Sequence, residues 1–349
     1  MNEILKKLID IHSLSVDEYE TLLNNIDDSG KEILKDEAVR LATLVYGKKV
    51  FSRGLIEFSN YCKNNCYYCG IRNGNKNCER YRLTKEQIYE CANLGYQYGY
   101  RTIVLQSGED LYFDDDMMVE IISHLRNEFP DVAITLSIGE KEKSTYQKYF
   151  DAGANRYLLR HEAYNKNLYN KIHPKEMSYE HRIKCLYDLR AIGFQVGAGF
   201  MVECPHQTNY DLALDLKFIE EFKPEMCGIG PFIPHIDTIY KNEKAGTLEK
   251  TLLLLSITRI INPETLLPAT TALGTINPIG REMGILHGAN VIMPNISPSD
   301  ARKKYLLYDN KVSVNDDASK YRNELEDRMK NIGYELIVSR GDHISFNHL

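Results

Sequence analysis

The chain has 349 residues, of which 43% are hydrophobic and 26% charged, a composition typical of a globular protein with a sizeable core. Its 43 basic and 49 acidic residues give a formal net charge of −6 without a dense basic stripe, so a nucleic-acid partner is not expected. The longest apolar stretch, residues 252–261, is short and contains Ser, Thr and Arg, and the N-terminus carries acidic residues. We therefore predict neither a membrane span nor a secretory signal, and expect a cytoplasmic protein.

Residues 1–48 are predicted to be helical and to lead into the main domain. Apolar residues such as Ile4, Leu8 and Ile11 recur at helical spacing, and Ser15 and Glu18 form a capping-box pattern before a second helix.

From about residue 54, short apolar or β-branched runs alternate with polar loops and longer amphipathic segments. The eight runs are residues 55–59, 102–106, 132–137, 156–160, 195–202, 226–230, 265–270 and 290–294. Because parallel neighbours need a crossover helix between them, this alternation predicts an α/β fold, a (β/α)8 TIM-type barrel over residues 49–300. A doubly wound sheet is the alternative. Residues 301–349, mostly charged and helical with a short β-like run, are expected to be an extension packed on the barrel.

Polar residues gather directly after these runs, for example Ser107 to Asp110 after the second, His161 and Glu162 after the fourth and Asn295 after the eighth. In a barrel, these positions share one face. Barrel enzymes place their active sites there, so the sequence predicts a site at the carboxyl ends of the strands.

Three of the eight cysteines, Cys62, Cys66 and Cys69, have CxxxCxxC spacing in the loop after the first run. Their thiolates can hold three irons of a [4Fe–4S] cluster and leave the fourth iron without a protein ligand. An open iron can bind the amino and carboxylate groups of S-adenosylmethionine. One electron passed to the sulfonium then gives methionine and a 5′-deoxyadenosyl radical. The spacing thus favours a radical site.

Two other interpretations of this cluster stay open. Structural zinc takes four ligands in spaced pairs, but no second pair follows here. A closed electron-transfer cluster would use Cys78 as its fourth ligand. Among the other cysteines, Cys204 with His206 could bind a metal, although a packed loop is preferred. The remaining three are expected to pack in the core: Cys91, Cys185 and Cys227.

Eight blocks in order over residues 50 to 300 resemble the radical S-adenosylmethionine superfamily and, within it, the HydE family of [FeFe]-hydrogenase maturases. They are FSNYCKNNCYYCGIR, RYRLTKEQI, TIVLQSGED, TLSIGE, RYLLRHE, GIGPFIPH, PATTALGT and GANVIMPN. Biotin synthase and methylornithine synthase share the cysteine motif and the barrel with that family, but not the LQSGED, RHE and PATTALGT blocks together.

The resemblance implies roles for particular residues. Cys62, Cys66 and Cys69 match the cluster ligands, and Tyr68 matches an aromatic residue beside the adenine. Contacts with S-adenosylmethionine are implied for Ser137, Glu162 and Arg182; alternatively, Glu162 and Arg182 form a structural pair. An inner cavity that binds an anionic small-molecule or organometallic substrate is implied for Arg53, Arg156, Arg160, Thr270 and Thr271, although arginines at strand ends can also cap a barrel.

The resemblance also implies a function in assembly of the di-iron site. The radical would attack a sulfur of an organometallic, cysteine-bound iron precursor. A reductant such as a ferredoxin or flavodoxin, and other maturases, are implied partners. The alternatives are a radical mutase or thiol-processing enzyme like methylornithine synthase, and a non-catalytic iron–sulfur carrier.

The chain departs from its relatives at two places. Glu203 to Thr208 (ECPHQT) replaces a glycine-rich turn found in many radical enzymes, which puts the local turn in doubt. Residues 228–349 contain no cysteine, whereas some HydE proteins carry three for an auxiliary cluster, so no second cluster is expected.

Overall fold

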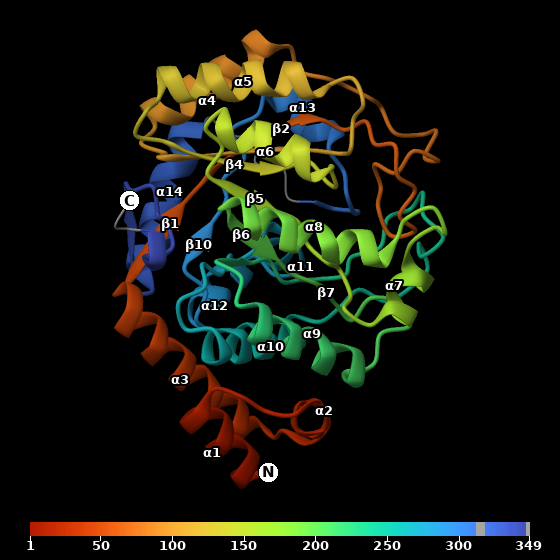
Figure 1. Cartoon of the computed structure of the whole chain (residues 1–349). Coiled ribbons are helices and arrows are strands. Elements are labelled where there is room, and N and C mark those ends of the chain that lie inside the picture. The colour runs from red at the N-terminus through yellow and green to blue at the C-terminus, as the bar shows by residue number, and fades with distance from the viewer. Residues whose placement is uncertain (312–317, 347–349) are drawn as a thin grey trace.

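The computed structural model describes residues 1–311 and 318–346 and begins with three helices (Figure 1). These are α1 (Asn2–Ile11), α2 (Val16–Asn25) and α3 (Asp28–Tyr46), so the helical prediction for this segment is confirmed. The capping box at α2 forms as predicted, since Ser15 Oγ accepts a hydrogen bond from Glu18 N and the Glu18 carboxylate accepts one from Ser15 N. Helix α2 packs on α9 (Asn209–Phe222), and α3 on α10 (Leu248–Ile261).

Six parallel strands form the main sheet, in the order β2-β3-β4-β5-β6-β8. They are β2 (Gly54–Ser59), β3 (Thr102–Ser107), β4 (Ala133–Ser137), β5 (Arg156–Leu158), β6 (Gln195–Ala198) and β8 (Met226–Cys227). Two smaller parallel sheets pair β7 (Met201–Val202) with β9 (Gly230–Pro231), and β1 (Lys49–Ser52) with both β10 (Val291–Ile292) and β11 (Glu335–Ile337).

Isolated bridges connect β8 back to β2 in steps, through residues 266–268 and 291–295, and so close the sheet into a barrel. This closure rules out the doubly wound alternative. The seventh predicted run supplies single bridges in place of a regular strand; it contains Pro268, which has no N–H to donate to a strand ladder. The closing bridges are Met226–Leu266, Pro268–Val291 and Leu55–Asn295.

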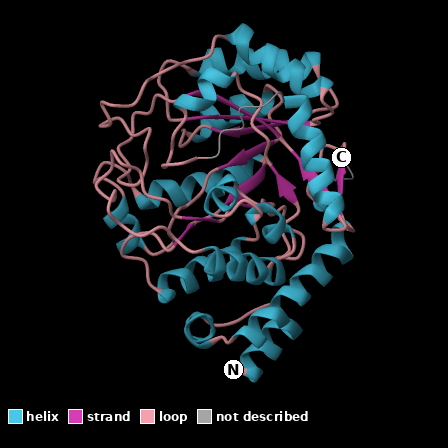
Figure 2. Cartoon of the chain, turned by 180° about the vertical axis from the view of Figure 1, so that it is seen from behind, coloured by secondary structure: helices cyan, strands magenta, loops and turns pink. Residues whose placement is uncertain are grey.

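Helices surround the strands on the outside (Figure 2). Those that follow the lead-in are α4 (Lys85–Gln97), α5 (Asp115–Glu128), α6 (Lys143–Asp151), α7 (Lys166–Ile172), α8 (Tyr179–Ile192), α9 (Asn209–Phe222), α10 (Leu248–Ile261), α11 (Thr271–Ile276), α12 (Gly280–Ile285), α13 (Ser299–Lys304), α14 (Ala318–Asn331) and the 3₁₀ turn Ile344–Phe346. The apolar stretch at residues 252–261 is the buried part of α10, which packs on both α9 and α3. No helix in the described ranges is long and apolar enough to cross a bilayer.

Two predicted strands are each broken by a glycine. The run 195–202 divides into β6 and β7 at Gly199, and the run 226–230 divides into β8 and β9 at Gly228. The two backbones meet there, because a Cβ on Gly199, whose φ is 150°, would lie 2.0 Å from the Gly228 carbonyl oxygen. Only glycine allows this approach.

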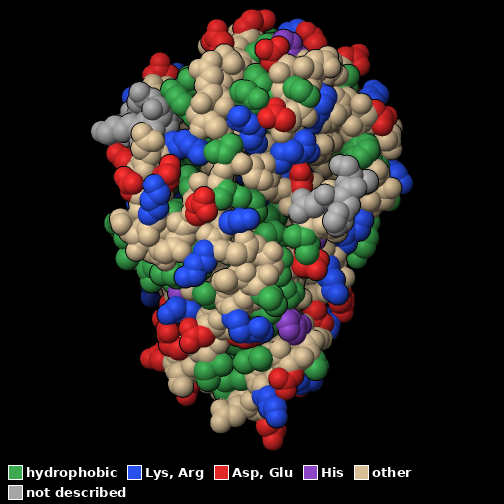
Figure 3. Space-filling model, turned by 90° about the vertical axis from the view of Figure 1, so that its left-hand side faces the viewer, with side chains coloured by type: hydrophobic (Ala, Val, Ile, Leu, Met, Phe, Trp, Pro, Cys, Tyr) green, Lys and Arg blue, Asp and Glu red, His purple; other side chains and the backbone are tan. Residues whose placement is uncertain are grey.

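The segment after residue 300 reaches both ends of the barrel. Near its start, Leu307 O accepts a hydrogen bond from Gly70 N in the cysteine loop. Near its end, Arg340 O accepts hydrogen bonds from Thr102 and Arg156, the first residues of β3 and β5. On the face shown in Figure 3, acidic and basic side chains are interspersed.

Candidate active site

A pocket of about 350 Å³ opens at the carboxyl ends of the strands. Ser107 and Ser137, the last residues of β3 and β4, line it together with residues of the loop after β2. The site therefore lies at the barrel end that the sequence predicted.

Cys62, Cys66 and Cys69 all line this pocket. Cys62 Sγ accepts a hydrogen bond from Glu109 N at 3.4 Å, and Cys66 Sγ lies 3.5 Å from Met177 Sδ. Burial raises the pKa of the Cys69 thiol to about 12. A bound metal stabilises thiolates and releases these protons, so the three thiols form a ligand set that a cluster would complete.

Gly70 lets a second segment close over this loop. A Cβ at residue 70 would lie 2.2 Å from the Leu306 carbonyl oxygen and 2.3 Å from a carbon of the His235 ring. Glycine is therefore required directly after Cys69.

Cys78 does not share the pocket. Its sulfur lies 3.7 Å from Asn60 Nδ2, and it is absent from the described residues that line the cavity. The closed-cluster alternative requires a fourth sulfur beside the other three, so this placement argues against it.

Tyr68 also lines the pocket, and His173 holds its hydroxyl. His173 Nδ1 lies 3.0 Å from Tyr169 O, and only a protonated Nδ1 can donate to that carbonyl. Burial lowers the pKa of His173 to about 3, so the ring is neutral and its Nε2 accepts from the Tyr68 hydroxyl at 3.0 Å. This bond fixes the aromatic ring that the resemblance places beside an adenine.

Glu162 and Arg182 line the same pocket but form separate ion pairs. Arg182 Nε lies 2.6 Å from Glu140 Oε1, and Glu162 Oε2 lies 3.0 Å from Arg160 Nη2. The alternative that Glu162 and Arg182 pair with each other is therefore not what the structure shows.

Two buried polar atoms at the pocket have neither a hydrogen bond nor an ion pair among the described residues. They are Arg160 Nε and Thr270 Oγ1. Unsatisfied groups of this kind are costly in a folded protein, so a charged and polar ligand is expected to satisfy them.

Sequence reasoning missed the group that positions Glu162. Glu162 has a φ of 65°, and its N donates to Gly199 O. Gly199 N donates in turn to His161 Nδ1, whose Nε2 lies 3.1 Å from Asp215 Oδ1. Burial lowers the pKa of His161 to about 3, so a neutral ring links the two strands. The RHE block held this histidine, but its partner Asp215 is distant in sequence.

The residues predicted for the anion divide into three groups. Arg160, Thr270 and Thr271 line the pocket. Arg53 is buried outside the pocket lining, where its Nε and Nη2 have no hydrogen-bond partner in the described chain, so its contact with an anion stays a prediction.

The structure does not bring Arg156 to the pocket. It is the first residue of β5, it is fully buried, and its Nη2 lies 2.7 Å from Asp342 Oδ1. The start of a strand lies at the barrel end opposite the pocket, and the carboxylate already neutralises this guanidinium. Arg156 therefore caps the barrel, the second interpretation that the sequence allowed.

The pocket contains a buried ion pair that the sequence did not suggest. Lys311 Nζ lies 2.5 Å from Glu57 Oε1, and both residues line the cavity. Tyr305 and Tyr308 come from the same C-terminal segment. These residues are far from β2 in sequence, so no local pattern could place them there.

The turn at 203–208 contains no glycine but has two residues in the left-handed region. Glu203 and His206 adopt left-handed φ values of 56° and 70°. The Glu203 carboxylate accepts hydrogen bonds from Thr247 N and Oγ1, at the start of α10. Cys204 is buried in a small apolar cluster and the His206 ring lies against Tyr240, so the structure favours packing over a metal pair here.

Comparison with known proteins agrees with this geometry. The model of the "Radical SAM superfamily" matches residues 56–219. The chain is 48% identical to "[FeFe] hydrogenase maturase subunit HydE" of Thermotoga maritima, over 83% of each chain. The chain belongs to the HydE family of radical S-adenosylmethionine enzymes.

More distant relatives share the fold of this HydE-family chain. It is 28% identical to "3-methylornithine synthase" of Methanosarcina acetivorans, over 85% of this chain and 83% of the relative. The crystal structure of methylornithine synthase (PylB) has a TM-score of 0.83 at 26% identity and covers 96% of this chain and 97% of its own. A structure of the maturase HydG has a TM-score of 0.79 at 21% identity, covering 95% and 75%.

Radical S-adenosylmethionine enzymes use a [4Fe–4S] cluster and S-adenosylmethionine. The pocket fits both groups. It offers three thiols on one loop for three irons, and the Glu162 carboxylate and the Arg182 guanidinium for the ammonium and carboxylate of an amino acid.

Proposed function

We propose that this chain acts in assembly of the di-iron site of an [FeFe]-hydrogenase. Its substrate is an anionic, cysteine-bound organometallic iron precursor. The observation that carries the proposal is that one pocket contains three thiols, the Arg160 and Arg182 guanidinium groups and the Thr270 hydroxyl, in a chain 48% identical to a HydE maturase. A ferredoxin or flavodoxin supplies the electron to this chain. Other maturases exchange iron species with this chain.

Cys62, Cys66 and Cys69 would hold the cluster, and Tyr68, Ser137, Glu162 and Arg182 would hold S-adenosylmethionine. When bound, these groups supply a one-electron reductive cleavage that releases methionine and generates a carbon radical for attack at a substrate sulfur. Arg182 orients the amino-acid carboxylate, and Glu162 receives the ammonium or ribose.

Arg160, Thr270 and Thr271 would position the anionic substrate. The Thr270 hydroxyl is buried and unpartnered in the described structure, so it can donate to an anion without losing an existing bond. The Arg160 guanidinium lies beside Glu162, so a substrate bound to Arg160 would lie next to S-adenosylmethionine bound to Glu162. Tyr305 and Tyr308 line the pocket from the C-terminal segment and would help to exclude water from the bound substrate.

The cluster-loaded chain tests the radical chemistry directly. With dithionite and S-adenosylmethionine under anaerobic conditions, methionine and a deoxyadenosine-derived product should form. The electron paramagnetic resonance signal of the reduced cluster should change when S-adenosylmethionine is added. Cys66→Ala should lose the cluster and both effects, whereas Cys78→Ala should retain them. An unchanged signal would support an iron–sulfur carrier instead.

A second candidate is a radical mutase on a small molecule, favoured by the match of the whole fold to methylornithine synthase. Expression of the chain in a strain that lacks its hydE gene separates the two. Restored hydrogenase activity supports the maturase. Failure to restore it, with 3-methylornithine detected among the products of the purified enzyme, supports the mutase.

A further inference from the structure

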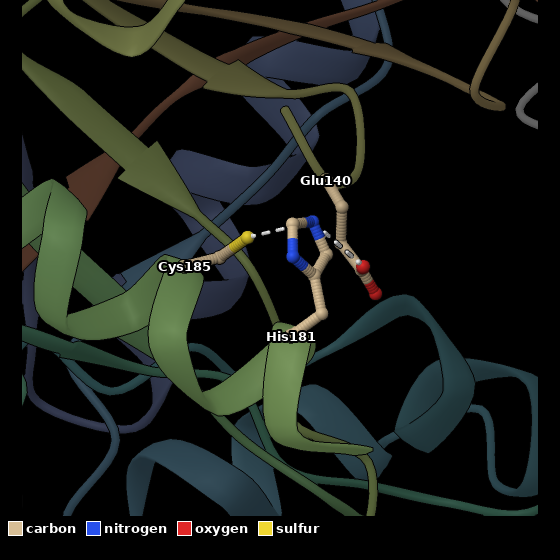
Figure 4. A group of neighbouring side chains, drawn as sticks. All are labelled: Glu140, His181 and Cys185. Carbon is tan, nitrogen blue, oxygen red and sulfur yellow. Dashed lines mark hydrogen bonds and ion pairs between the residues drawn. The ribbon is translucent and has the colours of Figure 1, made fainter. Parts of the chain in front are cut away.

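A group of side chains of the types that bind metals lies next to the pocket, where Glu140 pairs with the pocket residue Arg182. Glu140 follows β4, and His181 and Cys185 are four residues apart on α8, which places them on one helix face. The three side chains point toward one another (Figure 4). None of them lines the pocket that holds the three cysteines.

The distances within this group suit a tetrahedral ion. Cys185 Sγ and Glu140 Oε2 each lie 3.5 Å from His181 Nε2, and no two ligand atoms are more than 4.8 Å apart. With zinc–sulfur bonds of about 2.3 Å and zinc–nitrogen or zinc–oxygen bonds of about 2.0 Å, tetrahedral ligands are separated by about 3.3 to 3.5 Å. Two of the three separations already have that length.

The surroundings of these three side chains allow an ion to enter and provide negative charge for it. The His181 side chain is 36% exposed, so an ion can reach the site from solvent, whereas Cys185 is buried. Glu140 uses Oε1 for Arg182 and keeps Oε2 for a ligand. One thiolate and one carboxylate, the latter shared with Arg182, supply negative charge to a divalent ion, and water can fill its fourth position.

We propose that Glu140, His181 and Cys185 form a binding site for a divalent thiophilic ion of the zinc class, separate from the radical site. On binding, a bond forms between the ion and Cys185 Sγ. The thiol proton, which points to Lys141 O, leaves to solvent. The site does not depend on the function proposed above, because it uses none of the pocket residues.

Equilibrium dialysis of the cluster-loaded chain against Zn²⁺, with zinc and iron measured per chain, tests the proposal. One zinc per chain is expected with the iron content unchanged, and Co²⁺ in place of Zn²⁺ should add a thiolate-to-cobalt absorption band. Cys185→Ser should abolish that band, and His181→Gln should weaken zinc binding about tenfold or more. Cys91→Ser, which alters a buried cysteine of α4, should bind as wild type does.

His181→Gln changes a partly exposed residue and keeps the test decisive if Cys185→Ser does not fold. Absence of bound zinc in the wild-type chain would overturn the proposal. So would equal zinc affinity of the wild-type chain and His181→Gln, because the ion would then lie elsewhere.

Discussion

Arg182 Nε lies 2.6 Å from Glu140 Oε1, and this ion pair holds the guanidinium at the wall of the pocket. Arg182 Nη1 also donates to the Arg160 carbonyl oxygen at 3.3 Å. The guanidinium is thus positioned by two fixed acceptors before any ligand binds, and such preorganisation lowers the cost of binding a carboxylate.

Arg182→Lys should weaken S-adenosylmethionine binding. The lysine ammonium cannot reproduce the planar guanidinium, which donates from several nitrogens and is held by Glu140 and the Arg160 carbonyl oxygen. A lost charged hydrogen bond contributes about 1.5 to 3 kcal/mol, which corresponds to roughly tenfold to 100-fold in affinity. Isothermal titration of cluster-loaded protein measures this loss. Arg190→Lys, on the same helix, should bind as wild type does. Equal affinities for wild type and Arg182→Lys would remove Arg182 from the binding site.

Lys311→Ala should destabilise the fold far more than Lys304→Ala. Both lysines lie 2.5 Å from a glutamate, but the Lys311 and Glu57 side chains are 8% and 1% exposed, whereas those of Lys304 and Glu79 are 32% and 72% exposed. Removing one partner of a buried pair costs about 3 to 5 kcal/mol. Removing one from an exposed pair costs about 1 kcal/mol or less. Urea unfolding of the two variants compares these losses.

The loss in Lys311→Ala should depend on pH. Burial raises the pKa of Glu57, and Lys311 opposes that rise, so the carboxyl group of the variant protonates more readily. A folded pKa above the unfolded value favours folding at low pH and disfavours it as pH rises. The variant should therefore lose less stability at about pH 5 than at about pH 7. An equal loss at both values would contradict a buried, ionised Glu57.

The Lys311–Glu57 pair shows which parts of the site can be predicted from sequence. The three cysteines lie within one loop, so their spacing reveals their chemistry. Glu57 lies inside a strand run and Lys311 follows 254 positions later, and only the folded chain brings them together. For the same reason, the contact between His161 and Asp215 could not be predicted from the sequence.

Arg156 shows a different limit. The sequence analysis correctly placed Arg156 at the end of a strand. Whether that end lies at the pocket or at the opposite end of the barrel depends on the direction of the strand. Arg156 begins β5 and reaches the amino end, while Arg160 follows β5 and reaches the pocket. The fold itself was predictable because hydrophobic runs and helices alternate locally. The breaks at Gly199 and Gly228 depend on contact between two strands and could not be read from either run alone.

Asp342→Asn should remove part of the loss of folding stability that the wild-type chain shows as pH falls. Despite the opposing effect of burial, Arg156 and Arg340 hold the pKa of Asp342 well below its usual range. A lowered folded pKa contributes stability above the unfolded value of about 3.9, and that contribution is lost as pH falls. At about pH 7 the variant should be less stable by about 3 kcal/mol, because Arg156 is then buried without its carboxylate.

The difference between wild type and Asp342→Asn should shrink between about pH 4 and pH 2. Thermal unfolding across that range measures it. Asp131→Asn is the control, because Asp131 pairs with Arg101 at 3.0 Å but its side chain is 51% exposed, so a change of about 1 kcal/mol or less is expected. A difference that stays constant on acidification would show that Asp342 is not held ionised by Arg156.

His206→Gly and Glu203→Gly should change stability in opposite directions, although both residues have left-handed φ values of 70° and 56°. Glycine removes a strain of about 1 to 2 kcal/mol at such a position but adds about 0.4 to 1 kcal/mol of chain entropy in the unfolded state. The exposed His206 makes no hydrogen bond that offsets this strain in the described structure, so His206→Gly should stabilise the fold by about 0.5 to 1 kcal/mol.

Glu203→Gly gains the same relief but loses the carboxylate that accepts from Thr247 N at 2.6 Å and from Thr247 Oγ1 at 2.7 Å. Charged hydrogen bonds contribute about 1.5 to 3 kcal/mol, so this variant should be less stable than wild type by about 1 kcal/mol or more. Denaturant unfolding of both variants measures the sign of each change in the free energy of unfolding. Stabilisation in both would mean that the contact with Thr247 contributes little, and destabilisation in both would mean that His206 is not strained.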